Sequence, residues 1–540
     1  MIEIKNIPDL VADGVASGWK VQSLGEQTKS STIECDVVIV GTGAGGGTAA
    51  EILSAAGLDV VMIEEGPLRS SRDFRLNERD AYRDLYQEGA GRTTKDGSMT
   101  ILQGRSVGGS TTVNWTSSFR TPPQTLQHWA SVHDVKGAGV DEMAPWFERM
   151  EQRLGITPWA VAANANNHVL KDGCEKLGLS WQGIPRNVTA CWNLGYCGMG
   201  CAVNAKQSML VTTIPAALKS GARLYARARA DKVLLTKGRA TGVQCMGMHE
   251  DGVTPTGITL TVKARQVVLS GGGINNPGLL LRSDVPDPNK VIGSRTFLHP
   301  VNMVFARFDE RVDPWGGAPQ SVYSDHFQWK DGVTGPMGFK LEAIPLHPVL
   351  ASGLIGGHGT AHANDMAALG HTNGLIALMR DGFTEDSPGG QIILRADGTP
   401  TVDYDWSDSL RAAVRRAFLA MAEIQFAAGA KAVRPKQLGA GWYGSWAECR
   451  EAIMAFPIEK FRTGLGSAHI MGGCAMGEDQ KRSVVNSLGR HHLIEGLSVM
   501  DGSLFPTSIG ANPQLSVYGL VAKLATTLAD ELKPARPQVV

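Results

Sequence analysis

The feature that most constrains the fold is a glycine-rich turn at the start of the segment 36–66. An apolar run at 37–40 leads directly into Gly41-x-Gly43-x-x-Gly46, and a stretch of small residues suited to a helix follows. In the βαβ units that bind dinucleotides, the first glycine permits a tight turn and the second admits the pyrophosphate. The third lets the helix pack closely on the strand, and the helix N-terminus offers free N–H groups to the phosphates.

A second apolar run at 60–63 follows the predicted helix and ends at Glu64. Glu64 lies 23 residues after Gly41, where a carboxylate can accept hydrogen bonds from both ribose hydroxyls. The segment therefore predicts a dinucleotide-binding domain. The motif by itself does not distinguish NAD from FAD.

Composition excludes several classes of protein. With 540 residues the chain is expected to form two or more domains. Its 52 basic and 52 acidic residues leave no net charge that would favour nucleic acid. No apolar run reaches the ~18 residues of a membrane-spanning helix, and residues 1–20 lack the pattern of a secretory signal. We expect a cytoplasmic enzyme, with peripheral or periplasmic attachment through a partner subunit as the open alternative.

Periodicity outlines the remaining architecture. A helix is expected at 141–154, with Trp and Met side chains of the region 141–159 in the core or in the wall of a substrate cavity. A further helix is plausible at 73–90. The other expected segments are β-rich regions at 222–269 and 301–405, a long helix at 409–430, and short glycine-bounded elements over the last hundred residues. This order indicates a nucleotide-binding domain interrupted by insertions.

Four further segments rich in glycine or small polar residues follow along the chain. They read GRSVGGSTTVN at 104–114, SGGGINNPGLLLR at 270–282, SAHIMGGCAMG at 467–477 and SVMDGSLFPTSIGANPQLSVY at 498–518. The first has many free backbone donors and little bulk, which suits contact with a flat ring and a phosphate. In the second we expect a helix that begins at Pro277.

In order, spacing and content, the five segments resemble the glucose–methanol–choline (GMC) family of FAD-dependent oxidoreductases over nearly the whole chain. The resemblance, and not the periodicity, implies that the dinucleotide is FAD. It implies an α/β fold, α+β overall, in which a Rossmann-like FAD-binding domain is interleaved with a substrate-binding domain built on an antiparallel sheet. The predicted boundaries are 31–130, 205–300 and 460–540 for the FAD-binding domain, and 131–204 and 301–459 for the substrate-binding domain.

The resemblance also implies which residues contact the cofactor. In the family the first signature covers the isoalloxazine and phosphates, and the DGS segment at 501–503 contacts the flavin end. Asn276 stands where the family has Ser or Thr before proline, and a short polar residue still suits a turn or cap. The predicted cofactor residues are Gly41, Gly43, Gly46, Glu64, Gly104, Arg105, Gly108, Gly109, Ser110, Asn114, Val233, Asp501, Gly502, Asn512, Pro513 and Gln514. Because residues 104–118 contain no histidine, we expect non-covalent FAD.

Oxidation of a CH–OH group requires a base for the hydroxyl proton and an acceptor for the hydride. Histidine suits the role of base, and His469 matches the family's catalytic base position. Asn512 matches the second catalytic position, where an amide hydrogen-bonds the substrate oxygen. The resemblance makes His299 a structural residue near the cofactor, and it places the pair His491–His492 on a surface loop.

Three cysteines, Cys191, Cys197 and Cys201, have C-x5-C-x3-C spacing, and two interpretations compete. Some related flavin dehydrogenases carry an Fe–S cluster on three cysteines at this place, and thiolates are the ligands that such a cluster requires. Alcohol-oxidising members have a similar segment, followed by Ala and Lys, without an established cluster. Because Ala205 and Lys206 follow here, we favour a disulfide or buried free thiols over a possible Fe–S cluster.

The predicted activity is FAD-dependent oxidation of an alcohol, preferably apolar or aromatic, to an aldehyde or ketone. The alternatives are a sugar or polyol dehydrogenase with an Fe–S relay and a non-redox FAD-dependent lyase. Oxygen, a quinone or a cytochrome is the expected electron acceptor, and an electron-transfer subunit is a possible partner. No transmembrane segment is predicted.

Overall fold

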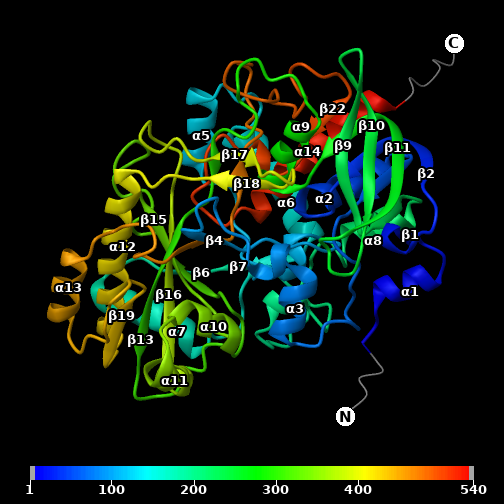
Figure 1. Ribbon diagram of the computed structural model, residues 1–540. Helices are drawn as coiled ribbons and strands as arrows, with labels where there is room; N and C mark the ends of the chain where they lie inside the picture. Colours follow the sequence, from blue (N-terminus) through cyan, green and yellow to red (C-terminus); the bar gives the residue numbers. More distant parts are fainter. Residues whose placement is uncertain (1–6, 534–540) are drawn as a thin grey trace.

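The computed structural model describes residues 7–533 as a mixed α/β protein with two large sheets (Figure 1). The first six residues of the stretch inspected for a signal, and the last seven of the predicted segment 460–540, lie outside these described residues. The two sheets lie side by side, and helices pack on the faces of both (Figure 1).

The first sheet carries the dinucleotide fingerprint and has the strand order β1-β8-β3-β2-β11-β10-β9, with β22 also paired to β11. The strands from β1 to β11 run parallel, and β10 and β9 add an antiparallel extension. Its strands are β1 (Lys20–Ser23), β2 (Ser31–Val40), β3 (Val60–Ile63), β8 (Arg223–Ala226), β9 (Ala228–Thr236), β10 (Arg239–Met248), β11 (Pro255–Leu269) and β22 (Leu497–Val499). Residues 37–39 of β2 and 60–62 of β3 are fully buried, as expected for central parallel strands.

The second sheet is mainly antiparallel and has the order β4-β20-β13-β16-β15-β14-β6, with β19 also paired to β13. Its strands are β4 (Met99–Ile101), β6 (Gln182–Gly183), β13 (Val301–Arg307), β14 (Val322–Ser324), β15 (Phe339–Ala343), β16 (Thr372–Met379), β19 (Ala432–Pro435) and β20 (Leu465–Ser467). The edge pair β4 and β20 therefore brings the residues just before the first signature beside those just before His469.

Side chains along these strands alternate between the two faces of the second sheet, and both faces are buried. Val304, Ala306 and Ala377 belong to the core under the helix α12 (Asp408–Ala427), whereas Met303 and Phe305 belong to a smaller apolar cluster on the opposite face. Side chains of successive strand residues point to opposite faces, so one sequence supplies both clusters. Three short strand pairs complete the sheets: β12 (Thr296–Phe297) with β21 (Met471–Gly472), β17 (Gln391–Leu394) with β18 (Pro400–Asp403), and β5 (Ile156–Pro158) with β7 (Pro185–Asn187).

Several helices agree with the periodicity of the sequence. The helix expected at 141–154 is α6, and the one expected at 409–430 is α12, which packs on the second sheet (Figure 1). Within 73–90 the α-helix is limited to α3. The helices are α1 (Leu10–Ala16), α2 (Ala44–Ala55), α3 (Glu78–Leu85), α4 (Ser110–Val113), α5 (Pro123–Val132), α6 (Val140–Arg153), α7 (Ala165–Leu177), α8 (Thr213–Lys219), α9 (Gly272–Arg282), α10 (Pro348–Ile355), α11 (Gly359–Ala367), α12 (Asp408–Ala427), α13 (Trp446–Ala455) and α14 (Gln514–Leu532).

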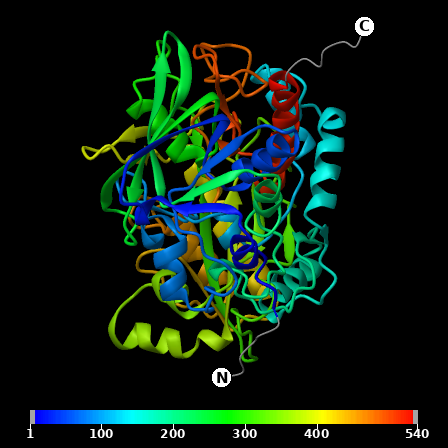
Figure 2. The same cartoon turned by 90° about the vertical axis from the view of Figure 1, so that its right-hand side faces the viewer.

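Two expectations for helices are wrong. The helix α9 begins at Gly272, so Pro277 lies inside it and does not start it. The last hundred residues were expected to hold only short elements, yet they contain the 19-residue helix α14. This helix contacts α2 and α6, is buried on most of its surface, and therefore lacks the apolar stripe by which surface helices are detected (Figure 2).

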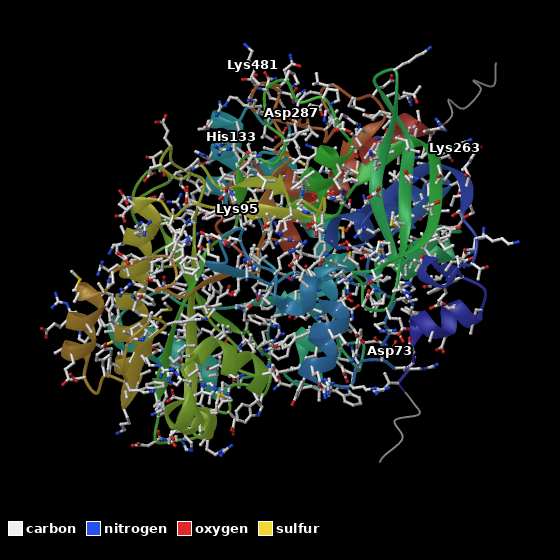
Figure 3. The ribbon with its side chains drawn as sticks, viewed as in Figure 1. Asp73, Lys95, His133, Lys263, Asp287 and Lys481 are labelled. Atoms are coloured by element: carbon white, nitrogen blue, oxygen red, sulfur yellow. The ribbon has the colours of Figure 1, made fainter. Side chains whose placement is uncertain are left out.

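The exposed charged side chains are consistent with the equal numbers of basic and acidic residues in the sequence. Exposed side chains such as Lys263 and Lys481 project outward at separate places on the molecule (Figure 3). Between residues 7 and 533 there is no helix with the length and apolar character needed to cross a bilayer.

Candidate active site

The glycine turn after β2 has the geometry that phosphate binding requires. Gly41 has a φ of 96°, and a side chain there would collide with the backbone of Ser270. A side chain on Gly46 would collide with the carbonyl of Gly41. The helix α2 begins after Gly43, and no described side chain caps its first turn. Its first N–H groups therefore suit the pyrophosphate of a dinucleotide.

Glu64 is almost fully buried, and its carboxylate is held by protein donors. One oxygen accepts hydrogen bonds from the backbone N and the Oγ1 of Thr42, at 3.1 and 2.6 Å, and the other accepts from the Gly66 backbone N at 2.9 Å. Burial raises the pKa of this carboxyl group, and these hydrogen bonds oppose the rise. A carboxylate can accept about four hydrogen bonds, so capacity for one ribose hydroxyl remains. The ribose role of Glu64 stays a prediction.

The first signature is attached to the fingerprint by direct contacts. The backbone N of Gly108 donates to Thr42 Oγ1 at 3.1 Å, and a Cβ on Gly109 would lie 2.7 Å from the Cα of Gly43. Within the signature, the backbone N of Gly104 donates to Ser110 Oγ at 2.9 Å. The structure thus brings two glycine-rich segments, predicted separately, into one backbone surface with little side-chain bulk.

Two of the predicted cofactor residues form hydrogen bonds with other parts of the protein. The Arg105 side chain donates to the Gly252 carbonyl oxygen at 2.7 Å. The backbone N of Val233 donates to Ser283 Oγ at 2.9 Å, so this N–H is not available to a ligand. The cofactor roles of Arg105 and Val233 stay predictions, and the geometry favours them less than those of the glycines.

Asp501 joins the second signature to the C-terminal segment. Its carboxylate accepts from the Gly272 backbone N at 2.6 Å, from Asn276 Nδ2 at 2.9 Å, and from the backbone N and Oγ of Ser503 at 2.9 and 2.5 Å. Asn276 also accepts from the Gly271 backbone N at 2.7 Å through its Oδ1. Asparagine therefore caps this turn where the family has Ser or Thr. Gly502 begins a short 3₁₀ turn after Asp501.

The start of α14 is tied to the first signature. Pro513 is the N-cap residue of this helix, and the next residue, Gln514, accepts a hydrogen bond from Asn114 Nδ2 at 2.7 Å. The Nε2 of Gln514 donates to the Ser117 carbonyl oxygen at 2.8 Å and to Ser118 Oγ at 2.9 Å. These contacts span 400 residues of sequence and place Asn512 beside the segment that follows the first signature.

His469 lies next to a second histidine that the sequence analysis treated as structural. The Nδ1 atoms of His299 and His469 are 3.1 Å apart, so one ring donates and the other accepts. His469 is partly exposed although protein atoms surround it closely. This desolvation, together with the nearby Lys340 ammonium, lowers the pKa of the imidazolium to about 3. The His469 ring is therefore neutral at physiological pH.

The backbone at His299 is held by a buried acidic residue. The Asp381 carboxylate accepts from the backbone N atoms of Leu298 and His299 at 3.1 and 3.2 Å, and from the Tyr404 hydroxyl at 2.7 Å. His299 is fully buried, and its Nε2 has no hydrogen-bond partner among residues 7–533. Burial lowers the pKa of His299 well below its usual value.

Asn512 lies beside a buried ion pair that the sequence analysis missed. Its Nδ2 donates to Glu342 Oε2 at 3.2 Å, and its Oδ1 accepts from Lys340 Nζ at 3.4 Å. Lys340 and Glu342 belong to β15, where the pattern Lys-x-Glu within an apolar strand puts both side chains on one face. Two charged residues at alternate positions of a buried strand are the signal that could have identified them.

The cysteine segment contains thiols and lies next to the first signature. All eight cysteines fall within residues 7–533 and are free. No group of three or more His, Cys, Asp or Glu side chains in that range is arranged to hold a metal ion. Lys206 Nζ donates to the carbonyl oxygens of Cys197, Thr112 and Asn114 at 2.7, 2.6 and 3.0 Å. The choice between free thiols, a disulfide and an Fe–S cluster at this segment stays a prediction.

The prediction that His491 lies on the surface is wrong. His491 is buried, and its Nδ1 accepts from the backbone N atoms of Leu493 and Ile494 at 3.1 and 3.2 Å. Its neighbour His492 is partly buried, and its Nε2 lies 2.9 Å from Ser483 Oγ. The backbone turn that follows His491 binds its ring. No pattern of polar residues in the sequence predicts this contact.

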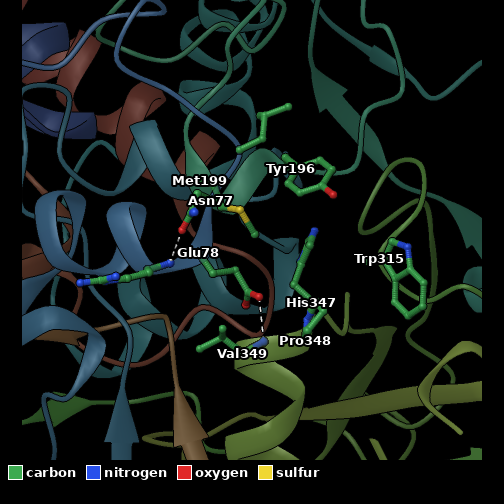
Figure 4. Close-up of a pocket in the computed structure, with 10 residues that line it drawn as sticks. Asn77, Glu78, Tyr196, Met199, Trp315, His347, Pro348 and Val349 are labelled. Carbon is green, nitrogen blue, oxygen red and sulfur yellow. Dashed lines mark hydrogen bonds between the residues drawn. The ribbon is translucent and has the colours of Figure 1, made fainter. Parts of the chain in front are cut away.

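A separate pocket of about 320 Å³ lies between α3, the cysteine segment and the start of α10 (Figure 4). Its wall includes Tyr196, whose ring centroid is 5.0 Å from that of His347. Glu78 accepts from the backbone N of Val349 at 2.7 Å and so caps α10 (Figure 4). None of the predicted catalytic or cofactor residues lines this pocket.

Comparison with known sequences identifies relatives along most of the chain. The N-terminal and C-terminal models of the GMC oxidoreductase family match residues 82–301 and 387–520. A long-chain-alcohol oxidase of Arabidopsis thaliana, FAO4B, is 30% identical over 93% of this chain and 68% of its own length. A GMC-type oxidoreductase of Mycobacterium tuberculosis is 32% identical over 92% of this chain and 76% of its own length.

Solved structures with the same arrangement include formate oxidase from Aspergillus oryzae and pyridoxine 4-oxidase from Mesorbium loti. Formate oxidase is 15% identical, with a TM-score of 0.70 over 94% of this chain and 100% of that chain. Pyridoxine 4-oxidase is 18% identical, with a TM-score of 0.65 over 91% of this chain and 99% of that chain. At this identity the similarity shows the fold, and it confirms the predicted fold class.

Proposed function

Because this chain belongs to the GMC oxidoreductase family, whose members act on CH–OH donors, we propose that it oxidises an apolar alcohol with non-covalent FAD. The observation that carries this proposal is that contacts between distant segments bring both predicted catalytic residues to the first signature. The strand before His469 pairs with the strand before that signature, and Gln514, two residues after Asn512, hydrogen-bonds Asn114 within it. FAD would supply N5 as the hydride acceptor.

The residues present fit FAD. Gly43 and Gly109 form a backbone surface without side chains, and the uncapped first turn of α2 provides N–H donors for the diphosphate. Asp501 fixes the second signature against this surface. We assign FAD to this surface, and the absence of histidine from residues 104–118 supports non-covalent attachment.

His469 is the proposed base. If its Nδ1–H donates to His299 Nδ1, then its Nε2 is unprotonated and can take the alcohol proton. The same hydrogen bond persists in the imidazolium that forms, because Nδ1 stays protonated. In this arrangement His299 fixes the reactive tautomer of His469. The carbon-bound hydrogen leaves as hydride as the proton passes to Nε2, which leaves the aldehyde or ketone as product.

The proposed substrate is an apolar alcohol. The relatives named as long-chain-alcohol oxidases support this proposal. The sugar dehydrogenase with an Fe–S relay has less support, because the relatives in the comparison are named as long-chain-alcohol oxidases.

The test is anaerobic mixing of the purified protein with primary alcohols of increasing chain length, followed at the visible absorbance of flavin. Bleaching by long-chain alcohols is expected, and His469→Ala is the matched negative control. Reoxidation by oxygen, a quinone analogue or cytochrome then identifies the acceptor. Protein that lacks flavin, or a flavin that no alcohol bleaches, would contradict the proposal. A flavin that sugars bleach faster than long-chain alcohols would contradict the substrate class.

A further inference from the structure

We propose that Lys340 and Glu342 are positioning residues of the active site, which hold the Asn512 amide in one orientation and place a fixed positive charge beside the reacting oxygen. This inference rests on the proposed function of Asn512 and His469. It assigns a task to a buried ion pair that neither cofactor binding nor proton transfer uses.

The chemistry of the partners determines the orientation of Asn512. A lysine ammonium can only donate and a carboxylate can only accept, so the amide oxygen must face Lys340 and the amide nitrogen must face Glu342. The contacts agree, at 3.4 Å for Lys340 Nζ to Oδ1 and 3.2 Å for Nδ2 to Glu342 Oε2. Nδ2 carries two hydrogens and Glu342 takes one. The second N–H is left for the substrate oxygen.

The ion pair is buried and anchored from several sides. Lys340 is 2% exposed and Glu342 is 0% exposed, with Nζ 3.5 Å from Oε1. Gln320 Nε2 donates to Glu342 Oε2 at 2.6 Å, and Gln320 Oε1 accepts from Ser117 Oγ at 2.7 Å. Ser117 in turn accepts from Gln514 through its carbonyl oxygen. The pair therefore belongs to a network that reaches both the first signature and the start of α14.

Two aromatic rings hold the ammonium in place. Lys340 Nζ lies 2.9 Å from the ring centroid of Phe119 and 4.2 Å from that of Tyr323. The two rings are nearly perpendicular to each other, and the Tyr323 hydroxyl is anchored to Gln182 at 2.9 Å. Such faces attract a cation and favour the charged amine over a neutral one.

A buried ion pair contributes little to folding stability, because the cost of removing both charges from water offsets much of their attraction. Glu342 Oε1 also accepts no hydrogen bond from the described residues, although it is fully buried. Placed beside Asn512, however, a fixed positive charge stabilises the negative charge that develops on the alcohol oxygen as its proton leaves. The position of the pair is therefore explained by the reaction better than by folding.

The charge of Lys340 gives this proposal a pH signature. Burial lowers the pKa of Lys340 to about 8, and Glu342 opposes that change. The charge is present below this pH and is lost above it. The other titratable groups around Lys340 are Asp325, Tyr323, His299 and His469. His469 is already neutral through this range, and the pKa of Tyr323 is raised to about 12, so neither produces a change near pH 8.

The first measurement is anaerobic flavin reduction by a long-chain alcohol across pH. The wild-type rate should fall as pH rises through about 8. Lys340→Met should be about 10- to 100-fold slower at pH 7 and should lack this fall, since the variant has no charge to lose. Lys340→Arg keeps its charge and should stay faster than Lys340→Met at pH 9. Lys436→Met, which removes a lysine next to β19 of the same sheet, should match the wild type.

The second measurement needs no alcohol. Sulfite forms an adduct with oxidised flavin that carries negative charge, so its dissociation constant reports nearby positive charge. Lys340→Met should bind sulfite at least about tenfold more weakly, and Glu342→Gln should bind it at least as tightly as the wild type. If no alcohol reduces the wild-type flavin and Lys340→Met still weakens sulfite binding, the proposed function fails while the fixed charge stands. Rates and sulfite affinities of Lys340→Met within twofold of the wild type would overturn the proposal.

Discussion

Replacement of His469 by alanine tests the proposed base most directly. General-base catalysis typically contributes ~10²–10⁴ in rate. The surroundings of His469 lower the pKa of its imidazolium to about 3, which makes the neutral ring a weak base. We therefore expect His469→Ala to slow flavin reduction by about 10²- to 10³-fold, towards the lower part of that range. FAD affinity should change little.

The same environment predicts the shape of the pH profile. Only neutral imidazole accepts a proton, so the rate that depends on His469 rises with pH through its pKa and is constant above it. With a pKa of about 3, the wild-type rate should be nearly flat between about pH 5 and 7.5. An ordinary histidine, with a pKa near ~6.5, would instead give a rise in the middle of that range.

The assay is stopped-flow absorbance of the flavin under anaerobic conditions, at saturating alcohol, from about pH 5 to 9. His358→Ala is the control, because His358 is exposed at the start of α11. His469→Gln keeps a polar side chain without a base and should be as slow as the alanine variant. Flavin reduction of His469→Ala within about threefold of the wild type would refute the assignment of the base. A wild-type rate that rises with a midpoint near ~6.5 would refute the argument from desolvation.

Four further predictions follow from the site. Glu64→Ala leaves two buried backbone N–H groups without an acceptor, at a cost of ~1–3 kcal/mol each. Both the FAD affinity and the urea midpoint of the apoprotein should therefore fall. If neither changes, Glu64 does not hold the glycine turn. His299→Phe removes the acceptor of the His469 Nδ1–H and should slow flavin reduction about tenfold with FAD binding intact; an unchanged rate argues against a fixed tautomer. Cys197→Ser should leave the visible spectrum unchanged, and wild-type iron well above roughly 0.3 per flavin would restore the Fe–S alternative. Acid precipitation should release the flavin, and a yellow pellet would contradict non-covalent attachment.

The sequence was sufficient to predict features that depend on local chemistry. The βαβ fingerprint predicted β2, α2 and β3 because apolar runs and glycine spacing specify the strand, turn and helix directly. The helices α6 and α12 followed from their periodicity, whereas the antiparallel character of the second sheet followed from the family resemblance. The helix α14 was missed because it is apolar on most of its faces, so it carries no amphipathic period.

Pairings between distant residues came only from the tertiary structure. His299 and His469 are separated by 170 residues, and Lys340 and Asn512 by 172 residues. No local pattern encodes which of the 13 histidines will meet, or that a lysine in an apolar strand will face an amide.

The sequence alone therefore determined the dinucleotide-binding unit, the family resemblance and the residue types of the proposed chemistry. These depend on backbone geometry and on short-range spacing. The tertiary structure decided that His299 hydrogen-bonds His469, that Glu64 and Asp501 anchor glycine turns, and that Lys340 and Glu342 flank Asn512. The physical reason is that burial and electrostatic coupling depend on the atoms surrounding a side chain, and those atoms come from segments hundreds of residues away.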